Sequence, residues 1–206
     1  MATPIEYATI DRAALVEIGQ GGEGRVFVWP NDQSTVYKEF HLSSQNPPNT
    51  VALNHLINLR SAWTEEERSW IEERTVWPQR AVLDGGRLMG YVMKRIPEAY
   101  FRQHGVRVMP RKVICDWNYL SMRGRYATNA NLVSTVPHPT TEQVSKLIVD
   151  LARTIEILHR HEVIVGDISG RNLIWTDHPS WQVMLIDCDG FRIRGSGAVN
   201  YGKQTP

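Results

Sequence analysis

The sequence has little of what marks several common protein classes. Its 206 residues include only two cysteines, Cys115 and Cys188, which are too few and too isolated for a disulfide framework or a zinc site. Lys and Arg number 23 against 22 for Asp and Glu, so the chain lacks the basic excess of a nucleic-acid-binding domain. No apolar run reaches the ~18 residues of a membrane-spanning helix, and residues 1–12 lack the apolar core of a secretion signal. We therefore expect a cytoplasmic, reducing setting, with neither nucleic acid nor membrane as a partner.

The first part of the chain is predicted to be mainly β-strand. With 42% hydrophobic residues, the chain can form one sizeable core or two small lobes that share a cleft. Five segments are rich in apolar, β-branched or aromatic residues and are separated by turns or loops that contain glycine or proline. These segments are residues 14–18, 25–29, 34–40, 80–83 and 88–93. They predict a five-stranded antiparallel sheet.

Helical periodicity is found in four segments, which are residues 50–59, 64–74, 111–125 and 140–158. Two of them begin with a capping box, in which Thr64 is followed by Glu67 and Thr140 is followed by Gln143. Residues 129–139 are expected to be loop. A run of strands followed by helices and two acidic turns predicts a two-lobed α+β fold.

Residues 19–26 contain a glycine-rich motif with the spacing G-x-G-x-x-G-x-V. The spacing is set by Gly19, Gly21, Gly24 and Val26, and Gly22 lies within it. Glycine permits close backbone approach and positive φ angles, so bare amide groups can face a phosphate chain. A tight hairpin turn without a ligand gives the same spacing. The chain continues as strand after the glycines, which argues against a dinucleotide-binding fold and favours a hairpin that covers phosphates.

Lys38 lies on the next predicted strand, on the same face as Val36 and Phe40, because side chains alternate with a period of two. An ammonium group on an apolar face is costly unless it is paired. Phosphate oxygens and a carboxylate would supply that pairing. The alternative is a lysine on an edge strand that reaches water.

Asp167 and Asn172 form the most specific polar pattern in the chain. A short apolar strand, residues 163–165, leads into Asp167, and Asn172 follows in the same loop. A carboxylate there can orient or deprotonate an attacking hydroxyl, and the amide oxygen of Asn172 can hold a divalent cation. Arg171 adds a fixed positive charge near a transferred group. A simple surface loop does not account for the apolar strands on both sides.

A second acidic turn follows the apolar strand 183–186. It contains Asp187 and Asp189, with Gly190 after them. Two carboxylates after a buried strand suit Mg²⁺, which prefers oxygen ligands and is usually held by one or two carboxylates together with phosphates. The alternative is an Asp-Gly turn between two strands that binds nothing.

Taken in order, these motifs resemble the eukaryotic-type protein kinase domain, in a divergent bacterial form. Residues 36–38 are similar to the V-A-I-K strand, whose lysine anchors the phosphates of ATP in that family. Residues 165–172 resemble the catalytic loop H-R-D-L-x-x-x-N, and residues 187–189 stand where D-F-G is expected. The likeness spans residues 14–206.

The resemblance implies ATP and Mg²⁺ as cofactors. Asp167, Lys38 and Arg171 would be catalytic, and Asn172 and Asp187 would hold the metal. The remaining positions implied are Met93 as gatekeeper, Lys94 and Ile96 for adenine, and residues 204–206 as the start of a substrate-docking turn.

The chain also departs from the family pattern. Gly166 replaces the arginine before the catalytic aspartate, and Asp189 replaces the last glycine of D-F-G, which leaves the leading metal carboxylate open between Asp187 and Asp189, with Asp187 preferred. No glutamate occurs in residues 50–63, where the helix that pairs with the anchoring lysine is expected. Either Glu67 serves instead, or the pair is missing.

These expectations combine into one functional hypothesis. Residues 1–13 would be an extension, 14–96 an N-lobe, and 97–206 an incomplete helical C-lobe cut short after the activation segment. Such a truncation would expose apolar surface to a second copy or a partner. The expected activity is Mg-ATP-dependent transfer to Ser/Thr hydroxyls of a protein, whose identity is open. The alternatives are a pseudokinase or nucleotide-binding scaffold, and a small-molecule kinase.

Overall fold

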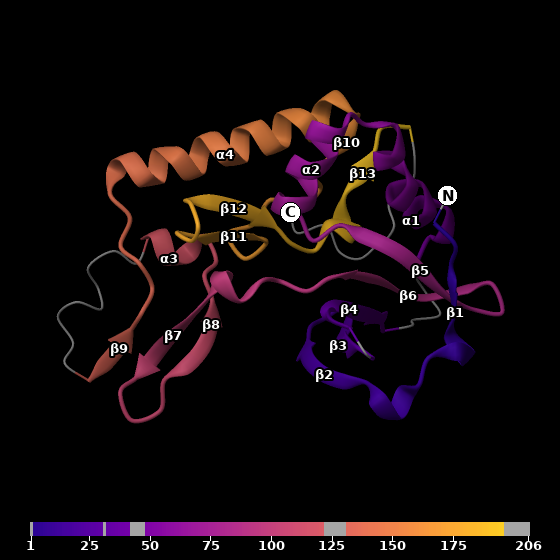
Figure 1. Cartoon of the computed structure of the whole chain (residues 1–206), viewed down its shortest axis with the longest axis horizontal. Helices are drawn as coiled ribbons and strands as arrows, with labels where there is room; N and C mark the ends of the chain where they lie inside the picture. The colour runs from indigo at the N-terminus through magenta and orange to yellow at the C-terminus, as the bar shows by residue number, and fades with distance from the viewer. Residues whose placement is uncertain (1, 31, 42–47, 122–130, 196–206) are drawn as a thin grey trace.

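A six-stranded sheet is the largest element of the protein (Figure 1). The computed structural model describes residues 2–30, 32–41, 48–121 and 131–195. The strand order is β1-β5-β6-β4-β3-β2, and every neighbouring pair is antiparallel except β1 and β5. The strands are β1 (Ile5–Glu6), β2 (Val16–Gln20), β3 (Gly24–Trp29), β4 (Asp32–Phe40), β5 (Pro78–Asp84) and β6 (Arg87–Lys94). The five predicted antiparallel strands are therefore present, and a sixth is added.

The added strand comes from the segment that was expected to be an N-terminal extension. β1 pairs in parallel with β5, so that Ile5 lies opposite Val82. Ile5 and Ile10 are buried and pack with Val82, Tyr37 and other apolar residues of the sheet. Burial of these two isoleucines removes apolar surface from water, which makes the first residues part of the folded unit.

The four helices of the described chain are α1 (Thr50–Leu59), α2 (Glu65–Arg74), α3 (Asn118–Ser121) and α4 (Thr141–Arg160). Both predicted capping boxes are confirmed, since Thr64 and Thr140 accept from the backbone N–H three residues later and the side chains at those positions bond back. No helix in this part of the chain is both long enough and apolar enough to cross a bilayer. The fold is mixed α+β.

The helix predicted over residues 111–125 is wrong. The chain there forms β8 (Arg111–Ile114), and α3 follows only after a break; residues 122–130 lie outside the described part. β8 pairs with β7 (Phe101–Val106), which in turn pairs with β9 (Leu132–Ser134), a strand inside the predicted loop. Strand pairing with β7, which directly precedes β8 in the chain, outweighs local helical preference here.

Two short strand pairs complete the described structure. β10 (Val163–Ile164) pairs with β13 (Arg192–Ile193), and β11 (Leu173–Thr176) pairs with β12 (Gln182–Leu185). In Figure 1, α4 runs along the β11–β12 pair, and the large sheet lies on the side of this pair that faces away from α4. One cluster of buried apolar side chains continues from the sheet through β12 to α4. The sheet and α4 are thus held by a common core.

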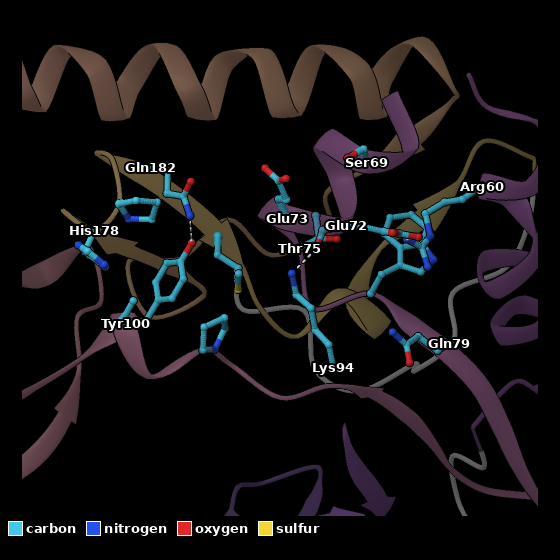
Figure 2. Close-up of a pocket in the computed structure, with 15 residues that line it drawn as sticks. Arg60, Ser69, Glu72, Glu73, Thr75, Gln79, Lys94, Tyr100, His178 and Gln182 are labelled. Carbon is cyan, nitrogen blue, oxygen red and sulfur yellow. Dashed lines mark hydrogen bonds and ion pairs between the residues drawn. The ribbon is translucent and has the colours of Figure 1, made fainter. Parts of the chain in front are cut away.

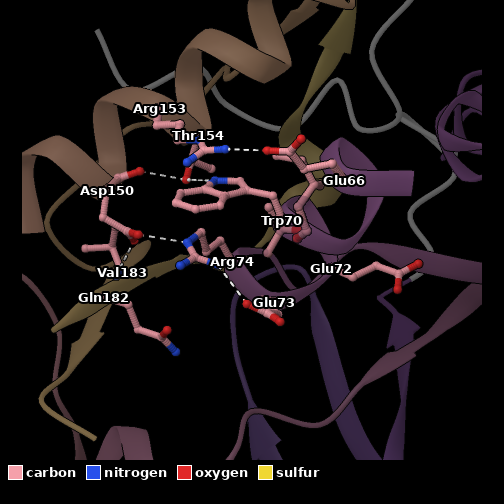
Figure 3. A network of polar contacts seen from close by, with 12 residues as sticks. Glu66, Trp70, Glu72, Glu73, Arg74, Asp150, Arg153, Thr154, Gln182 and Val183 are labelled. Atoms are coloured by element: carbon pink, nitrogen blue, oxygen red, sulfur yellow. Dashed lines mark hydrogen bonds and ion pairs between the residues drawn. The ribbon is translucent and has the colours of Figure 1, made fainter. Parts of the chain in front are cut away.

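Asp150 of α4 connects three elements of this core (Figure 3). One carboxylate oxygen accepts from Nε of Arg74 at the end of α2, at 2.8 Å. The other oxygen accepts from the backbone N–H of Val183 in β12, at 2.9 Å. The side chains of Arg74 and Asp150 are each only 10% exposed, so the ion pair is shielded from water.

Trp70 of α2 lies between two guanidinium groups in the same contact. Arg74 lies 3.5 Å and Arg153 of α4 lies 3.9 Å from its ring centroid. The indole N–H donates to the hydroxyl of Thr154 at 3.1 Å. Cation–π contacts of this kind stabilise by about 0.5–2 kcal/mol each when they are partly desolvated. α2 is therefore fixed against α4 and not only against the sheet.

Replacement of Asp150 by alanine is expected to destabilise the protein by about 3–5 kcal/mol, because it removes the buried partner of Arg74, which keeps only the exposed carboxylate of Glu73, and leaves the Val183 N–H without its acceptor. Urea unfolding followed by tryptophan fluorescence measures this free energy. Lys146→Ala, which removes only an exposed ion pair with Glu142 on the same helix, serves as control and should leave the midpoint unchanged. An Asp150→Ala protein as stable as the control would contradict the role given to this network.

Candidate functional site

Lys38 is the centre of the candidate site. It lies on β4, between β3 and β6, so the alternative of an edge-strand lysine is wrong. The residue is only 6% exposed. Its ammonium nitrogen lies 3.0 Å from both carboxylate oxygens of Asp189, 3.4 Å from Oδ1 of Asp187 and 3.5 Å from Oε2 of Glu23. The chain thus surrounds one buried cation with three carboxylates.

The charges around Lys38 set its protonation. Burial alone lowers the pKa of the ammonium group, but the neighbouring charges of Asp189, Asp187 and Glu23 outweigh it and raise the pKa above its ordinary value. Lys38 is therefore a permanent cation at neutral pH, available to hold negative groups.

The glycine-rich hairpin places Glu23 beside this cation. Its turn is closed by the N–H of Gly21, which donates to the carbonyl of Gly24 at 2.9 Å. A side chain added at Gly21 or Gly22 would meet no atom within 4 Å, and both residues are exposed. The backbone of the hairpin tip is therefore open to a ligand.

The reason for glycine in this hairpin differs from the prediction. φ is not positive at any of the described glycines 19, 21, 22 and 24. At Gly24 the requirement is steric, because a Cβ there would lie 2.1 Å from the carbonyl oxygen of Glu39 on β4. Gly24 lets β3 approach β4 closely, and Val26 then lies opposite Lys38 in the ladder.

The acidic turn after β12 brings its two carboxylates to Lys38 by an unusual backbone conformation. Asp187 has φ of 54° and ψ of 44°, in the left-handed region that few residues other than glycine adopt. A short 3₁₀ turn, Cys188–Gly190, follows directly. The side chain of Asp187 remains 55% exposed, whereas that of Asp189 is 1% exposed. Asp187 can therefore reach a ligand, and Asp189 faces the interior.

Tyr91 of β6 completes the buried side of the site. Its hydroxyl donates to Oδ1 of Asp189 at 2.8 Å. Burial, together with the negative charges of Asp189 and Asp187, raises the pKa of Tyr91 well above its ordinary range, so the phenol stays a donor. The sequence analysis missed this residue. Its role depends on the strand register, which places Tyr91 directly opposite Lys38 in the ladder.

Asp167 and Asn172 lie together, as their spacing predicted. The side-chain amide of Asn172 donates to Oδ2 of Asp167 at 2.9 Å and to its carbonyl at 3.3 Å, which leaves the amide oxygen outside that contact. The backbone N–H of Ile186 donates to the carbonyl of Asn172 at 3.0 Å. This bond places the loop next to the residue that precedes Asp187. Asp167 and Arg171 are both exposed.

Gly166 has a steric reason to be glycine. A Cβ at this position would lie 2.6 Å from the carbonyl oxygen of Gly190, at the end of the acidic turn. Real Cβ atoms do not approach a carbonyl so closely. The backbones of the Asp167 loop and of the acidic turn are therefore in direct contact, which a side chain at residue 166 would separate.

The predicted adenine-binding positions do not share one environment. Met93 is buried in the sheet opposite Val36, and Ile96 is partly buried against the same core. Lys94 instead turns toward α2 and donates to the carbonyl of Glu72. The N–H of Arg95, between Lys94 and Ile96, already donates to the carbonyl of Ser34.

Lys94 lines a cavity of about 670 Å³, shown in Figure 2. The cavity lies between α2, the chain after β6 and β12, and it is lined neither by Lys38 nor by Asp187. Its wall includes Glu73, Tyr100 and Gln182. Burial lowers the pKa of Lys94 to about 8.

Glu67 does not pair with Lys38, so that alternative is wrong. Its carboxylate accepts from Thr64 at the start of α2 and contacts Arg160 and His161 at the end of α4, at 2.8 and 3.2 Å. The carboxylate of Glu67 is therefore bound at the start of α2, by groups of α2 and α4.

Comparison with known proteins gave no match to any protein-family model and none to a curated protein. Within the described residues, no group of three or more His, Cys, Asp or Glu side chains is arranged to hold a metal ion by itself.

Gly166→Ala is expected to lower the free energy of unfolding by about 1–3 kcal/mol, because the added methyl group collides with the Gly190 carbonyl and forces the two backbones apart. Thermal or urea unfolding measures the change. Gly22→Ala, at an exposed position with no atom within 4 Å of the new methyl group, is the matched control and should stay within about 0.5 kcal/mol of wild type. Equal stability of the two variants would show that the contact imposes no constraint.

Lys94 is expected to make stability rise with pH. Its pKa is about 8 in the folded protein against an ordinary value of 10.5, so between these values the unfolded chain binds the proton and the folded chain does not. Stability from this group therefore increases from pH 8 to 10.5. The denaturant midpoints of wild type and Lys94→Met should be compared across that range. They should converge as pH rises, because only the wild type gains stability from this group. Parallel curves would contradict the assignment.

Proposed function

We propose that the protein is a Mg-ATP-dependent phosphotransferase of the protein-kinase-like type. In this proposal the six-stranded sheet is the N-lobe, and α4 with β10 to β13 belongs to the C-lobe. The observation that carries the proposal is the meeting of three distant segments at one buried ammonium group. The glycine hairpin, β4 and the acidic turn after β12 all contribute charged groups to it.

The electrostatics of this cluster favour a divalent cation. One ammonium group faces three carboxylates, so the cluster carries a net negative charge that a hard cation can neutralise. Asp187 is exposed, and the amide oxygen of Asn172 is not used by Asp167. These oxygens fit Mg²⁺, which takes carboxylate and amide ligands together with phosphates. Magnesium held there supplies neutralisation of charge on the phosphate oxygens.

The chain's own residues have separate tasks in this proposal. The exposed hairpin tip at Gly21 and Gly22 covers the phosphates, and Lys38 donates to their oxygens. Asp167 accepts the proton of the attacking hydroxyl or orients it, and the Asn172 amide holds that carboxylate in place. Arg171, which is exposed, provides positive charge near the transferred group. Catalysis of this type rests on positioning and on fixed charges.

The acceptor in this proposal is a Ser or Thr hydroxyl of a protein, and Met93 with Ile96 contacts the adenine. In this proposal a second copy or a partner covers exposed apolar side chains, such as Ile148 and Val149 of α4.

One observation favours a second candidate, a nucleotide-binding module without turnover. Both oxygens of Asp189 hold Lys38, so phosphate oxygens must compete with a bidentate contact. Slow or absent transfer with intact binding would identify this second function.

Mg-ATP is expected to raise the melting temperature of the wild-type protein, since a ligand that binds only the folded state stabilises it, by about 2.7 kcal/mol at 100 times its Kd. Asp187→Asn should lose the magnesium-dependent part of this shift. Asp84→Asn, the same change at the exposed last residue of β5, should keep it. Absence of any wild-type shift would remove the basis for the proposal.

Asp167→Ala tests the catalytic role separately from binding. This variant should keep the Mg-ATP melting shift and lose transfer of radiolabelled phosphate to a Ser/Thr peptide mixture. Transfer by wild type without loss in the variant, or equal loss of binding and transfer, would overturn the role given to Asp167.

A further inference from the structure

Neither helix beside the sheet offers a carboxylate to Lys38. α1 contains no acidic residue at all. α2 contains five glutamates, and each contacts a basic side chain other than Lys38. These pairs are Glu65 with Arg68, Glu66 with Arg153, Glu67 with Arg160, Glu72 with Arg60, and Glu73 with Arg74. Trp70 and Arg74 of α2 contact Thr154, Arg153 and Asp150 of α4, which fixes α2 against that helix.

Asp189 supplies what the helices do not. Its two oxygens lie at equal distances of 3.0 Å from the Lys38 nitrogen, a symmetric contact that fixes the ammonium group in one place. The hydroxyl of Tyr91 donates to one of these oxygens and orients the carboxylate. All three residues are buried. A buried carboxylate and a buried ammonium each lose several kcal/mol of hydration, so each requires the other.

Asp189 also belongs to the turn that carries Asp187. The two residues are separated by Cys188 alone, which is itself buried, and the left-handed conformation of Asp187 aims both carboxylates at Lys38. The contact joins residues 151 positions apart in the chain. A shift of the turn therefore moves the lysine, and a shift of the lysine moves the turn.

We infer that Asp189 is a positioning residue that holds Lys38 from the acidic turn itself and makes the lysine and Asp187 one unit. Assembly of the site then needs no movement of α1 or α2, and it cannot be switched by a helix that swings in or out. The meaning of this unit for phosphate transfer rests on the proposed function, but the positioning contact does not.

The contact can be tested without nucleotide by acylation of lysines with an N-hydroxysuccinimide ester, followed by mass spectrometry. In wild type, Lys38 should react slowly compared with the exposed Lys112. Asp189→Asn should accelerate modification of Lys38 at least tenfold, Asp189→Glu should restore protection, and Glu67→Gln on α2 should react as wild type. Reactivity of Lys94, a partly buried lysine that does not contact Asp189, reports general loosening in each variant, because a merely structural role of Asp189 would raise it together with that of Lys38.

Two results would overturn the inference. One is a Lys38 that stays protected in Asp189→Asn, and the other is a Lys38 that becomes reactive in Glu67→Gln. Where Asp189→Asn does not fold, Tyr91→Phe removes only the phenol oxygen and should still raise the Lys38 rate several-fold. An unchanged rate in that variant also contradicts the inference.

A second readout separates this inference from the proposed function. In the transfer assay, Asp189→Asn should lower kcat at least tenfold, Asp189→Glu should recover most of it, and Glu67→Gln should match wild type. If wild type neither binds ATP nor transfers phosphate while the acylation pattern holds, the phosphotransferase proposal fails and the positioning contact stands. If transfer occurs with the acylation pattern absent, the positioning contact fails alone.

Discussion

The burial of one ammonium group constrains the arrangement of the protein around it. Removing a lysine charge from water is unfavourable by several kcal/mol unless opposite charges replace the lost hydration. Around Lys38 these charges come from the tip of the glycine hairpin and from the acidic turn after β12. The hairpin, β4 and the end of β12 must therefore stay together in the folded state. The positions of Asp187 and of the neighbouring Asp167 loop follow from that requirement.

Short sequence patterns predicted those secondary-structure elements that are determined by interactions between residues close in the chain. The starts of α2 and α4 were recognisable because Thr64 and Thr140 form their caps within a few residues. β8 was mistaken for helix because its strand conformation depends on pairing with β7, and β1 was missed because two residues carry no periodicity. Both strands are stabilised by pairing with another strand, and for β1 that strand lies more than 70 residues further along the chain.

The candidate site divides in the same way. Lys38, Asp187, Asp167 and Asn172 were recognisable from residue type and spacing, and the structure brings Lys38 and Asp187 to 3.4 Å. Asp189 as the main partner of Lys38 was not predictable, because it requires the left-handed turn at Asp187. The absence of a side chain at residue 166 likewise has a reason only once the Gly190 carbonyl is seen against it.

The double contact of Asp150 has a consequence for how this sequence can drift over evolutionary time. One carboxylate serves a guanidinium on α2 and a peptide group on β12, the strand that leads into the acidic turn. A lineage that loses either Arg74 or Asp150 alone removes the buried ionic partner of the other. The two positions are therefore expected to change together. Such a change also alters the contact that holds β12, the strand that leads to Asp187.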